Sequence, residues 1–176
     1  MKKSIRLLTL ATVVFPTLAC TLFNPAARSQ ESVLEVALDE SPVPDSFTLV
    51  VEHPSHGDLA ALLAVHALRA AELERRPFVE FSADWCPPCI ALANSLTDHR
   101  MVEAFRGTYV IRLDIDEWKG RLASTGFVVI GVPTIFELAG DGLPTGRMLT
   151  GAAWGRDLPE NMAPPLKEFF EGPSEP

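Results

Sequence analysis

The sequence is short of cysteine, glycine and positive charge, and each shortage excludes a class of protein. Three cysteines among 176 residues are too few for a small domain held together by several disulfides. Eleven glycines beside 15 prolines, without a repeating spacing, exclude a collagen-like chain. Only 15 Lys and Arg residues oppose 23 Asp and Glu residues, for a net charge of −8. This balance argues against nucleic-acid binding, which requires clustered positive charge.

What is present suits one folded domain with extensions. Apolar residues make up 47% of the chain and charged residues 22%, which excludes disorder along its whole length. A length of 176 residues matches a single domain and its flanking segments. No internal repeat is visible.

Residues 1–23 have a basic start followed by a short apolar run, the form of a secretory signal peptide. The run ends at Cys20 in a pattern similar to the bacterial lipoprotein signal, in which the cysteine is lipidated. Three readings stay open: lipidation of Cys20, cleavage after Ala27, and an uncleaved anchor over residues 7–23. All three predict an exported protein on the periplasmic or cell-surface face of a bacterial membrane, where disulfides persist. Cleavage at Cys20 would remove three basic residues and leave a charge of −8 − 3 = −11.

The remaining chain divides by composition. Residues 24–45 are rich in Pro, Ser, Ala and Glu, which predicts a flexible tether. We expect the folded domain to span residues 46–172 and a short tail to follow at 173–176.

Hydrophobic periodicity in residues 46–172 predicts alternating strands and helices. We expect strands at 47–52, 78–81, 109–115, 131–137 and 147–150. We expect helices at 58–76, from about 86 to 105, at 118–124 and at 166–171, with Asp157 as a cap before the last. This order of elements predicts a compact α/β sandwich.

Cys86 and Cys89 are spaced i and i+3 at the predicted start of a helix. In a first helical turn two such cysteines can approach closely enough to form a disulfide. The helix N-terminus favours a thiolate at Cys86, and a thiolate is the attacking species in disulfide exchange. We therefore predict an accessible nucleophile at Cys86 and a buried resolving thiol at Cys89. Since Pro87 and Pro88 have no N–H, amides from Cys89 onward must serve the thiolate.

This motif alone also fits a structural disulfide or half of a zinc site. No second CxxC exists, and Cys20 lies in the leader, so histidines are the remaining candidate ligands. His53 and His56 have ligand-like spacing, although a surface loop also explains the pair. His66 lies on the apolar face of its predicted helix, as a core histidine would. We expect neither a metal nor an organic cofactor to be required.

Residues 78–89, with the sequence FVEFSADWCPPC, resemble the active-site strand and turn of the thioredoxin family. Residues 112–116, 131–134 and 151–152 resemble the family's third strand, its cis-proline loop and the small-residue pair after its last strand. The resemblance covers residues 47–171. It implies a thioredoxin-like three-layer sandwich, with a central mixed sheet flanked by helices.

The resemblance also implies roles for particular residues. Pro133 would follow a cis peptide bond and place the backbone of Val132 opposite Cys86, where it pairs with an incoming peptide. Glu80 would be a buried acid that exchanges a proton with Cys89. Trp85 would shield the disulfide and form part of the docking surface. Trp118 and Trp154 are expected to be packing residues.

The implied function is an exported, membrane-tethered thiol-disulfide oxidoreductase, acting as a reductase more than as an oxidase. Its partners would be protein disulfides and an upstream thiol electron donor, and we expect a monomer. The approach to the cysteines resembles the exported C-terminal domain of the transmembrane disulfide-reductant transporter. Two alternatives stay open: a copper or zinc chaperone that uses the same dithiol, and a redox-inert adaptor with the same fold.

Overall fold

The computed structural model describes residues 46–123 and 125–173. Cys20, the predicted leader and the predicted tether lie outside these residues. The strands and helices follow one another along the chain in the order β1 Thr48–Glu52, α1 Leu59–Glu72, β2 Arg76–Ser82, α2 Pro87–Ser95, α3 His99–Ala104, β3 Thr108–Asp114, β4 Thr134–Leu138, β5 Pro144–Thr150 and α4 Pro159–Glu171. Short 3₁₀ turns precede α1 at Pro54–His56 and follow β5 at Gly151–Ala153.

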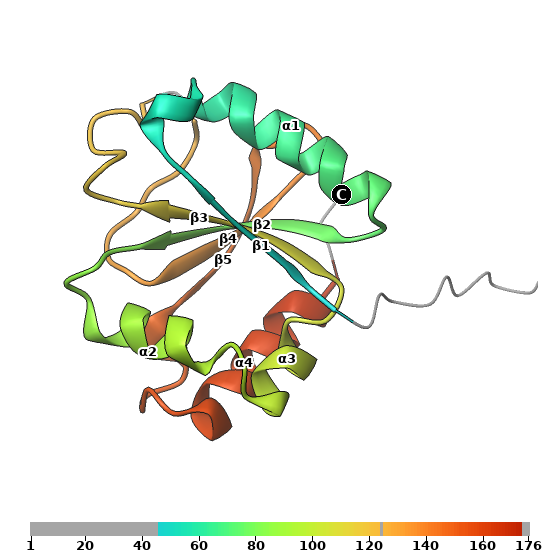
Figure 1. Ribbon diagram of the computed structural model, residues 1–176, viewed down its shortest axis with the longest axis vertical. Coiled ribbons are helices and arrows are strands. Elements are labelled where there is room, and N and C mark those ends of the chain that lie inside the picture. The colour runs from blue at the N-terminus through green and yellow to red at the C-terminus, as the bar shows by residue number, and fades with distance from the viewer. Residues whose placement is uncertain (1–45, 124, 174–176) are drawn as a thin grey trace, which may run out of the picture. The chain divides into compact units, whose positions relative to one another are not determined.

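The five strands form one mixed sheet in the order β1-β3-β2-β4-β5. Strands β1 and β2 pair with β3 in parallel, whereas β4 pairs antiparallel with both β2 and β5. Figure 1 shows α1 on one face of the sheet and α2, α3 and α4 on the other. The expected three-layer sandwich with a central mixed sheet is therefore confirmed.

Alternation along β2 supplies a core on each face of the sheet. Phe78 packs in a cluster with Leu92 of α2 and with residues of α3 and α4. Val79 and Phe81 point to the opposite face, where they cluster with Leu59 and other residues of α1. The strand that leads into the cysteine motif is thus buried on both sides, which fixes the position of its carboxyl end.

The first helix is shorter than predicted. It begins as expected, with Asp58 accepting a hydrogen bond from the amide of Ala61, but it ends at Glu72 instead of Arg76. Glu74 adopts a left-handed backbone with φ of 54°, which turns the chain into β2. Pro77 does not end the helix but lies inside β2. A proline is tolerated at this position because β4 pairs with β2 only from Phe78 onward, so no hydrogen bond between these two strands is lost.

The predicted helix from residue 86 to 105 is two helices. Helix α2 ends at Ser95 and α3 starts at His99. Between them, the carboxylate of Asp98 accepts a hydrogen bond from the amide of Arg100 at 2.9 Å. This N-cap satisfies a free amide at the start of α3, and the periodicity of apolar residues does not reveal the break.

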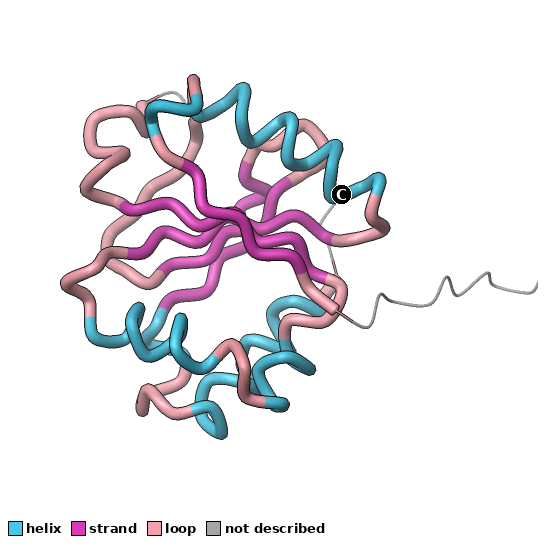
Figure 2. The backbone as a smooth tube through the Cα atoms, viewed as in Figure 1, coloured by secondary structure: helices cyan, strands magenta, loops and turns pink. Residues whose placement is uncertain are grey.

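The predicted helix at 118–124 is absent over its described residues, 118–123, which form turns and irregular loop. Figure 2 shows this part of the connection between β3 and β4 as loop. Its apolar residue Trp118 is fully buried and donates a hydrogen bond to the carbonyl oxygen of Glu52 at 3.1 Å. The apolar character that suggested a helix therefore reflects packing of a loop against α1 and β1.

Differences at the remaining elements concern their ends. Helix α4 starts at Pro159, earlier than residue 166, and contains Pro164 and Pro165. Asp157 does not cap it, because the N-cap position is Leu158, and the carboxylate of Asp157 instead accepts a hydrogen bond from the indole of Trp154 at 2.9 Å. Strand β4 begins at Thr134 and not at residue 131, and β5 begins at Pro144 and not at residue 147.

Gly142, in the turn between β4 and β5, is expected to be intolerant of alanine. Its φ is +83°, and an added Cβ would lie 2.5 Å from the backbone nitrogen of Ala64 in α1. Gly155 has a similar φ of +69° but no atom within 4 Å of an added Cβ. A left-handed alanine costs about 1–2 kcal/mol, so Gly155→Ala measures that cost alone.

We expect Gly142→Ala to lower the free energy of unfolding by a further 1–3 kcal/mol, roughly the cost of overpacking. Denaturant unfolding of both variants measures the difference. Equal destabilisation by the two substitutions would show that the turn does not pack against α1 as closely as described.

Candidate active site

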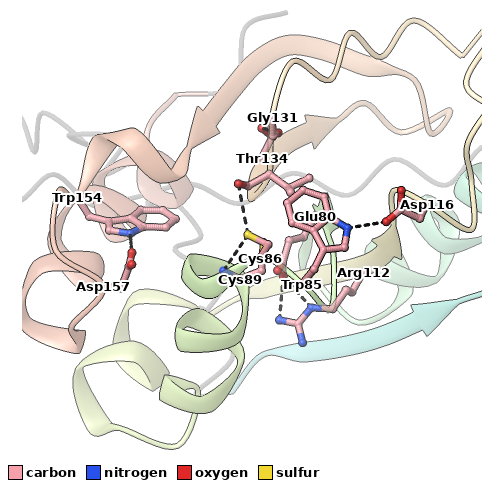
Figure 3. Close-up of a disulfide and its surroundings, with 11 residues drawn as sticks. Glu80, Trp85, Cys86, Cys89, Arg112, Asp116, Gly131, Thr134, Trp154 and Asp157 are labelled. Carbon is pink, nitrogen blue, oxygen red and sulfur yellow. Dashed lines mark hydrogen bonds and ion pairs between the residues drawn. A yellow bond between two sulfur atoms is a disulfide. The ribbon is translucent and has the colours of Figure 1, made fainter.

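Cys86 and Cys89 form a disulfide at the start of α2, close to the carboxyl end of β2 (Figure 3). Their Cα atoms are 5.2 Å apart, as the spacing of the motif predicts. Cys86 is the N-cap of α2, and the amide of Cys89 donates a hydrogen bond to its Sγ atom at 3.3 Å. The expectation that Cys89 supplies the first available amide, after two prolines, is confirmed.

Exposure does not distinguish the two cysteines in this oxidised form. Cys89 is 1% exposed and therefore buried as predicted, whereas Cys86, at 2% exposed, is not accessible in this form. What differs is the hydrogen bonding. The Sγ atom of Cys86 receives an amide at the positive end of a helix, which favours its thiolate.

The loop before β4 faces the disulfide. The peptide bond between Val132 and Pro133 is cis, as expected. The carbonyl oxygen of Val132 lies 3.5 Å from Sγ of Cys86. Pro133 contacts Gly151, whose amide donates a hydrogen bond to the Pro133 carbonyl at 3.0 Å. A Cβ at position 151 would lie 3.0 Å from Cδ of Pro133, which explains the small residue there.

Glu80 is fully buried in β2 (0% exposed) on the sheet face that also carries Phe78. Its Oε2 atom accepts hydrogen bonds from Nε and Nη2 of Arg112 at 3.2 and 3.0 Å. Its Oε1 atom is buried without a hydrogen-bond partner among the described residues. Burial raises the pKa of the Glu80 carboxyl, and the Arg112 guanidinium opposes the increase without cancelling it.

Arg112 is the site residue that the sequence did not reveal. It interrupts an otherwise apolar segment of β3, and that interruption is the only signal it gives. The register of the parallel pair β2–β3 places Arg112 directly beside Glu80. Knowing that these two residues meet requires the register, which a single sequence does not supply.

Glu80→Gln is expected to gain stability relative to the wild-type protein as the pH rises. The folded-state pKa of Glu80 is raised above its ordinary value of 4.5. The protonated carboxyl therefore stabilises the folded state, and this contribution is fully present below pH 4.5. This contribution is lost as the pH rises through the folded-state pKa. The neutral amide does not incur this loss, so the stability difference should grow with pH.

Denaturant unfolding of both proteins from pH 4 to 9 measures that difference. Glu168→Gln, at an exposed carboxylate in α4, provides the matched control and should show little such trend. A stability difference for Glu80→Gln that does not change with pH would contradict the raised pKa.

Trp85 lies beside the disulfide and is 66% exposed. Its indole nitrogen donates a hydrogen bond to the carboxylate of Asp116 at 2.6 Å, as Figure 3 shows. Trp154 and Trp118 are buried, as expected for packing residues. Trp154 nevertheless borders the site, because a Cβ at Gly151 would lie 3.3 Å from its ring.

Three of the four histidines, His53, His56 and His66, make hydrogen bonds to carboxylates. Nδ1 of His53 lies 2.7 Å from Glu117, and Nδ1 of His56 lies 2.6 Å from Glu52. His66 is largely buried, with 14% of its side chain exposed, and both ring nitrogens have hydrogen-bond partners: Nδ1 lies 2.9 Å from the hydroxyl of Tyr109 and Nε2 lies 2.8 Å from Glu52. Burial alone would raise the pKa of Glu52, but His56 and His66 outweigh it and lower that pKa.

Two features are absent from the part of the chain that the structure describes. Within residues 46–123 and 125–173, no three or more His, Cys, Asp or Glu side chains are grouped so as to hold a metal ion. In the same part of the chain, no helix combines the length and the apolar character needed to cross a membrane.

Comparison with known proteins places these features in a family. The family model described as thioredoxin matches residues 68–163, more than half of the chain. Among solved structures, thioredoxin from Trichomonas vaginalis is 27% identical, with 59% of this chain and 86% of that chain covered and a TM-score of 0.42. The disulphide isomerase from Xylella fastidiosa Temecula1 is 16% identical, covers 69% of this chain and 95% of its own, and has a TM-score of 0.48. A search of curated proteins gives no match.

With its mixed five-stranded sheet and its Cys86–Cys89 disulfide, this chain belongs to the thioredoxin family and is a thiol-disulfide oxidoreductase.

Proposed function

We propose that the protein is an exported, membrane-tethered reductase of protein disulfides. The observation that carries the redox part of the proposal is the Cys86–Cys89 disulfide at the N-terminus of α2, facing the cis peptide bond before Pro133. Support for export and tethering comes from the basic and apolar leader, which ends at Cys20.

In the proposed reaction the reduced protein transfers two electrons to its substrate. The thiolate of Cys86 attacks one sulfur of the substrate disulfide, forms a mixed disulfide and releases the other substrate sulfur as a thiolate, which takes up a proton. Cys89 then loses its proton and attacks Sγ of Cys86. This step forms the Cys86–Cys89 disulfide and releases the second substrate thiol. An upstream thiol donor returns the pair to the reduced state.

Glu80 is proposed to accept the proton that Cys89 loses. A raised pKa and an unpartnered Oε1 atom make the carboxyl of Glu80 suited to carry a proton inside the sheet. Arg112 holds the other oxygen atom, so it orients the carboxyl and stabilises its ionised form. Val132 is proposed to pair through its backbone with the substrate peptide, next to Pro133.

Reduction of insulin by dithiothreitol, followed by turbidity, tests the reductase. We expect catalytic amounts of the full-length protein to shorten the delay before insulin precipitates, relative to dithiothreitol alone. A disulfide that resists reduction under strongly reducing conditions would favour the redox-inert adaptor. Stoichiometric binding of Cu(I) or Zn(II) that needs both cysteines, without exchange activity, would favour the metal chaperone.

Tethering is tested separately by fractionation. The protein expressed with its leader should sediment with bacterial membranes, and Cys20→Ser should release it if Cys20 carries the lipid. Sedimentation of Cys20→Ser with membranes would favour the uncleaved anchor. Release of both proteins into the periplasm would favour cleavage after Ala27.

A further inference from the structure

Residues 131–133, which we call the 131–133 loop, carry the backbone that is proposed to receive the substrate peptide. Packing does little to hold the start of this loop. Ile130 is 90% exposed, and a Cβ added at Gly131 would have no atom within 4 Å. The side chain of Val132 packs against the core under α1, but the peptide groups on either side of Val132 must be held by hydrogen bonds.

Two hydrogen bonds hold the carbonyl groups that flank Val132 in the chain. The amide of Gly151 donates to the carbonyl oxygen of Pro133 at 3.0 Å. The hydroxyl of Thr134 donates to the carbonyl oxygen of Gly131 at 2.6 Å. The first bond joins two backbone groups, so only the second depends on the identity of a side chain.

The hydroxyl of Thr134 is a fixed donor. Thr134 is the first residue of β4 and is 1% exposed. Its backbone is paired with Phe81 of β2 and with Thr150 of β5, and its branched side chain has restricted rotation. The hydrogen bond spans three residues, as the closing bond of a β-turn does, and it joins the 131–133 loop to the sheet (Figure 3).

The same contact occurs at Thr108, whose hydroxyl donates to the carbonyl oxygen of Phe105, also at 2.6 Å. Such a bond satisfies a buried hydroxyl wherever it occurs. Thr134 differs from Thr108 in what lies beside its acceptor. The acceptor residue Gly131 precedes Val132, whose carbonyl oxygen lies 3.5 Å from the sulfur of the nucleophilic cysteine.

We propose that Thr134 is a positioning residue for protein substrates: its hydroxyl holds the backbone of Val132 where a substrate peptide pairs with it. This inference rests on the proposed function, since it assumes that a peptide binds along Val132 while Cys86 attacks. Without the hydroxyl, fewer molecules have the loop in the conformation that can pair, and the apparent affinity for a peptide falls by the same factor. Disulfides flanked by peptide backbone are therefore the substrate class that requires Thr134.

Two disulfides separate backbone pairing from exchange chemistry. Insulin has peptide backbone on both sides of its cysteines, whereas bis(2-hydroxyethyl) disulfide has no peptide group. Each is mixed below saturation with the reduced full-length protein, and formation of the Cys86–Cys89 disulfide is followed by acid quenching and mass spectrometry. Partial unfolding of a variant would change both rates, so the ratio of the insulin rate to the small-disulfide rate isolates the pairing.

Thr134→Val keeps the shape of the side chain and removes the hydroxyl. We expect it to lower the rate ratio by about fivefold, the factor that corresponds to the usual net free energy of one hydrogen bond. Thr134→Ser keeps the hydroxyl and should stay close to the wild-type ratio. Thr108→Val is the matched control, since Thr108 is equally buried and lies beside Arg76 at the opposite end of β2 from the disulfide. It should leave the ratio unchanged.

The outcomes distinguish this inference from the proposed function. If the wild-type protein reacts with neither disulfide, the proposed function is wrong, and the role of Thr134 falls with it. If the wild-type protein reacts with both and Thr134→Val keeps the wild-type ratio, exchange at Cys86 stands and the role of Thr134 is wrong. An equal fall of the ratio in Thr108→Val or in Thr134→Ser also overturns that role, because loss of the Thr134 hydroxyl then does not explain the effect.

Discussion

Cys86→Ser is expected to reduce insulin reduction to the rate of dithiothreitol alone. A serine hydroxyl does not ionise near neutral pH and cannot form a mixed disulfide, so no step of the exchange remains. The expected loss is the largest of any single substitution in this protein. Turbidity measured beside the wild-type protein gives the comparison.

Cys89→Ser is the matched control for Cys86→Ser. It breaks the same disulfide in the folded protein, so the two variants lose the same covalent link and differ only in which thiol remains. We expect Cys89→Ser to lose turnover but to keep one round of reaction with a substrate disulfide. Turnover by Cys86→Ser, or equal single-round reactivity of both variants, would contradict the assignment of Cys86 as nucleophile.

Trp118→Ala is expected to lower the free energy of unfolding by about 3–5 kcal/mol, the usual cost of removing a buried large aromatic side chain. Trp118 is fully buried in the core under α1, and its indole donates a hydrogen bond to the carbonyl of Glu52. The substitution leaves a cavity and removes this hydrogen bond. Denaturant or thermal unfolding measures the loss.

Trp85→Ala provides the matched comparison for stability, since it removes the same side chain from an exposed position. We expect that substitution to cost less than about 1 kcal/mol, as surface substitutions usually do. Similar losses for the two variants would show that the loop around Trp118 is not part of the folded core.

The sequence predicted the fold well wherever local patterns carry the information. The strand from Phe78 to Phe81 and the cysteine motif that follows it were confirmed as β2 and the start of α2. Helix ends were predicted less well, because they depend on single backbone states and caps. Examples are the left-handed Glu74 and the Asp98 cap between α2 and α3.

The parts of the site that lie within short sequence motifs were predicted. The disulfide between Cys86 and Cys89 and the cis bond before Pro133 are both present. The pairing of Glu80 with Arg112 depends on strand register, and the hydrogen bond from the indole of Trp85 to Asp116 depends on how the connection from β3 to β4 folds back. Both are tertiary features, and hydrophobic periodicity does not encode them.

The pair of Glu80 and Arg112 has a consequence for the second step of exchange, the release of the mixed disulfide. Arg112 stabilises the ionised carboxyl of Glu80, whereas burial favours the protonated form. If Glu80 is the proton acceptor for Cys89, Glu80→Gln should slow release of the mixed disulfide while leaving its formation unaffected. A slower first attack would instead place the effect of Glu80 on Cys86.

The most direct test of the proposed chemistry is to isolate the mixed disulfide. Reduced Cys89→Ala and reduced Cys86→Ala are each mixed with a peptide disulfide, quenched with acid and analysed by intact-mass and peptide mass spectrometry. We expect one peptide attached to Cys86 in the Cys89→Ala protein and almost none attached to Cys89 in the Cys86→Ala protein. Attachment mainly at Cys89, or none in either protein, would contradict exchange that begins at Cys86.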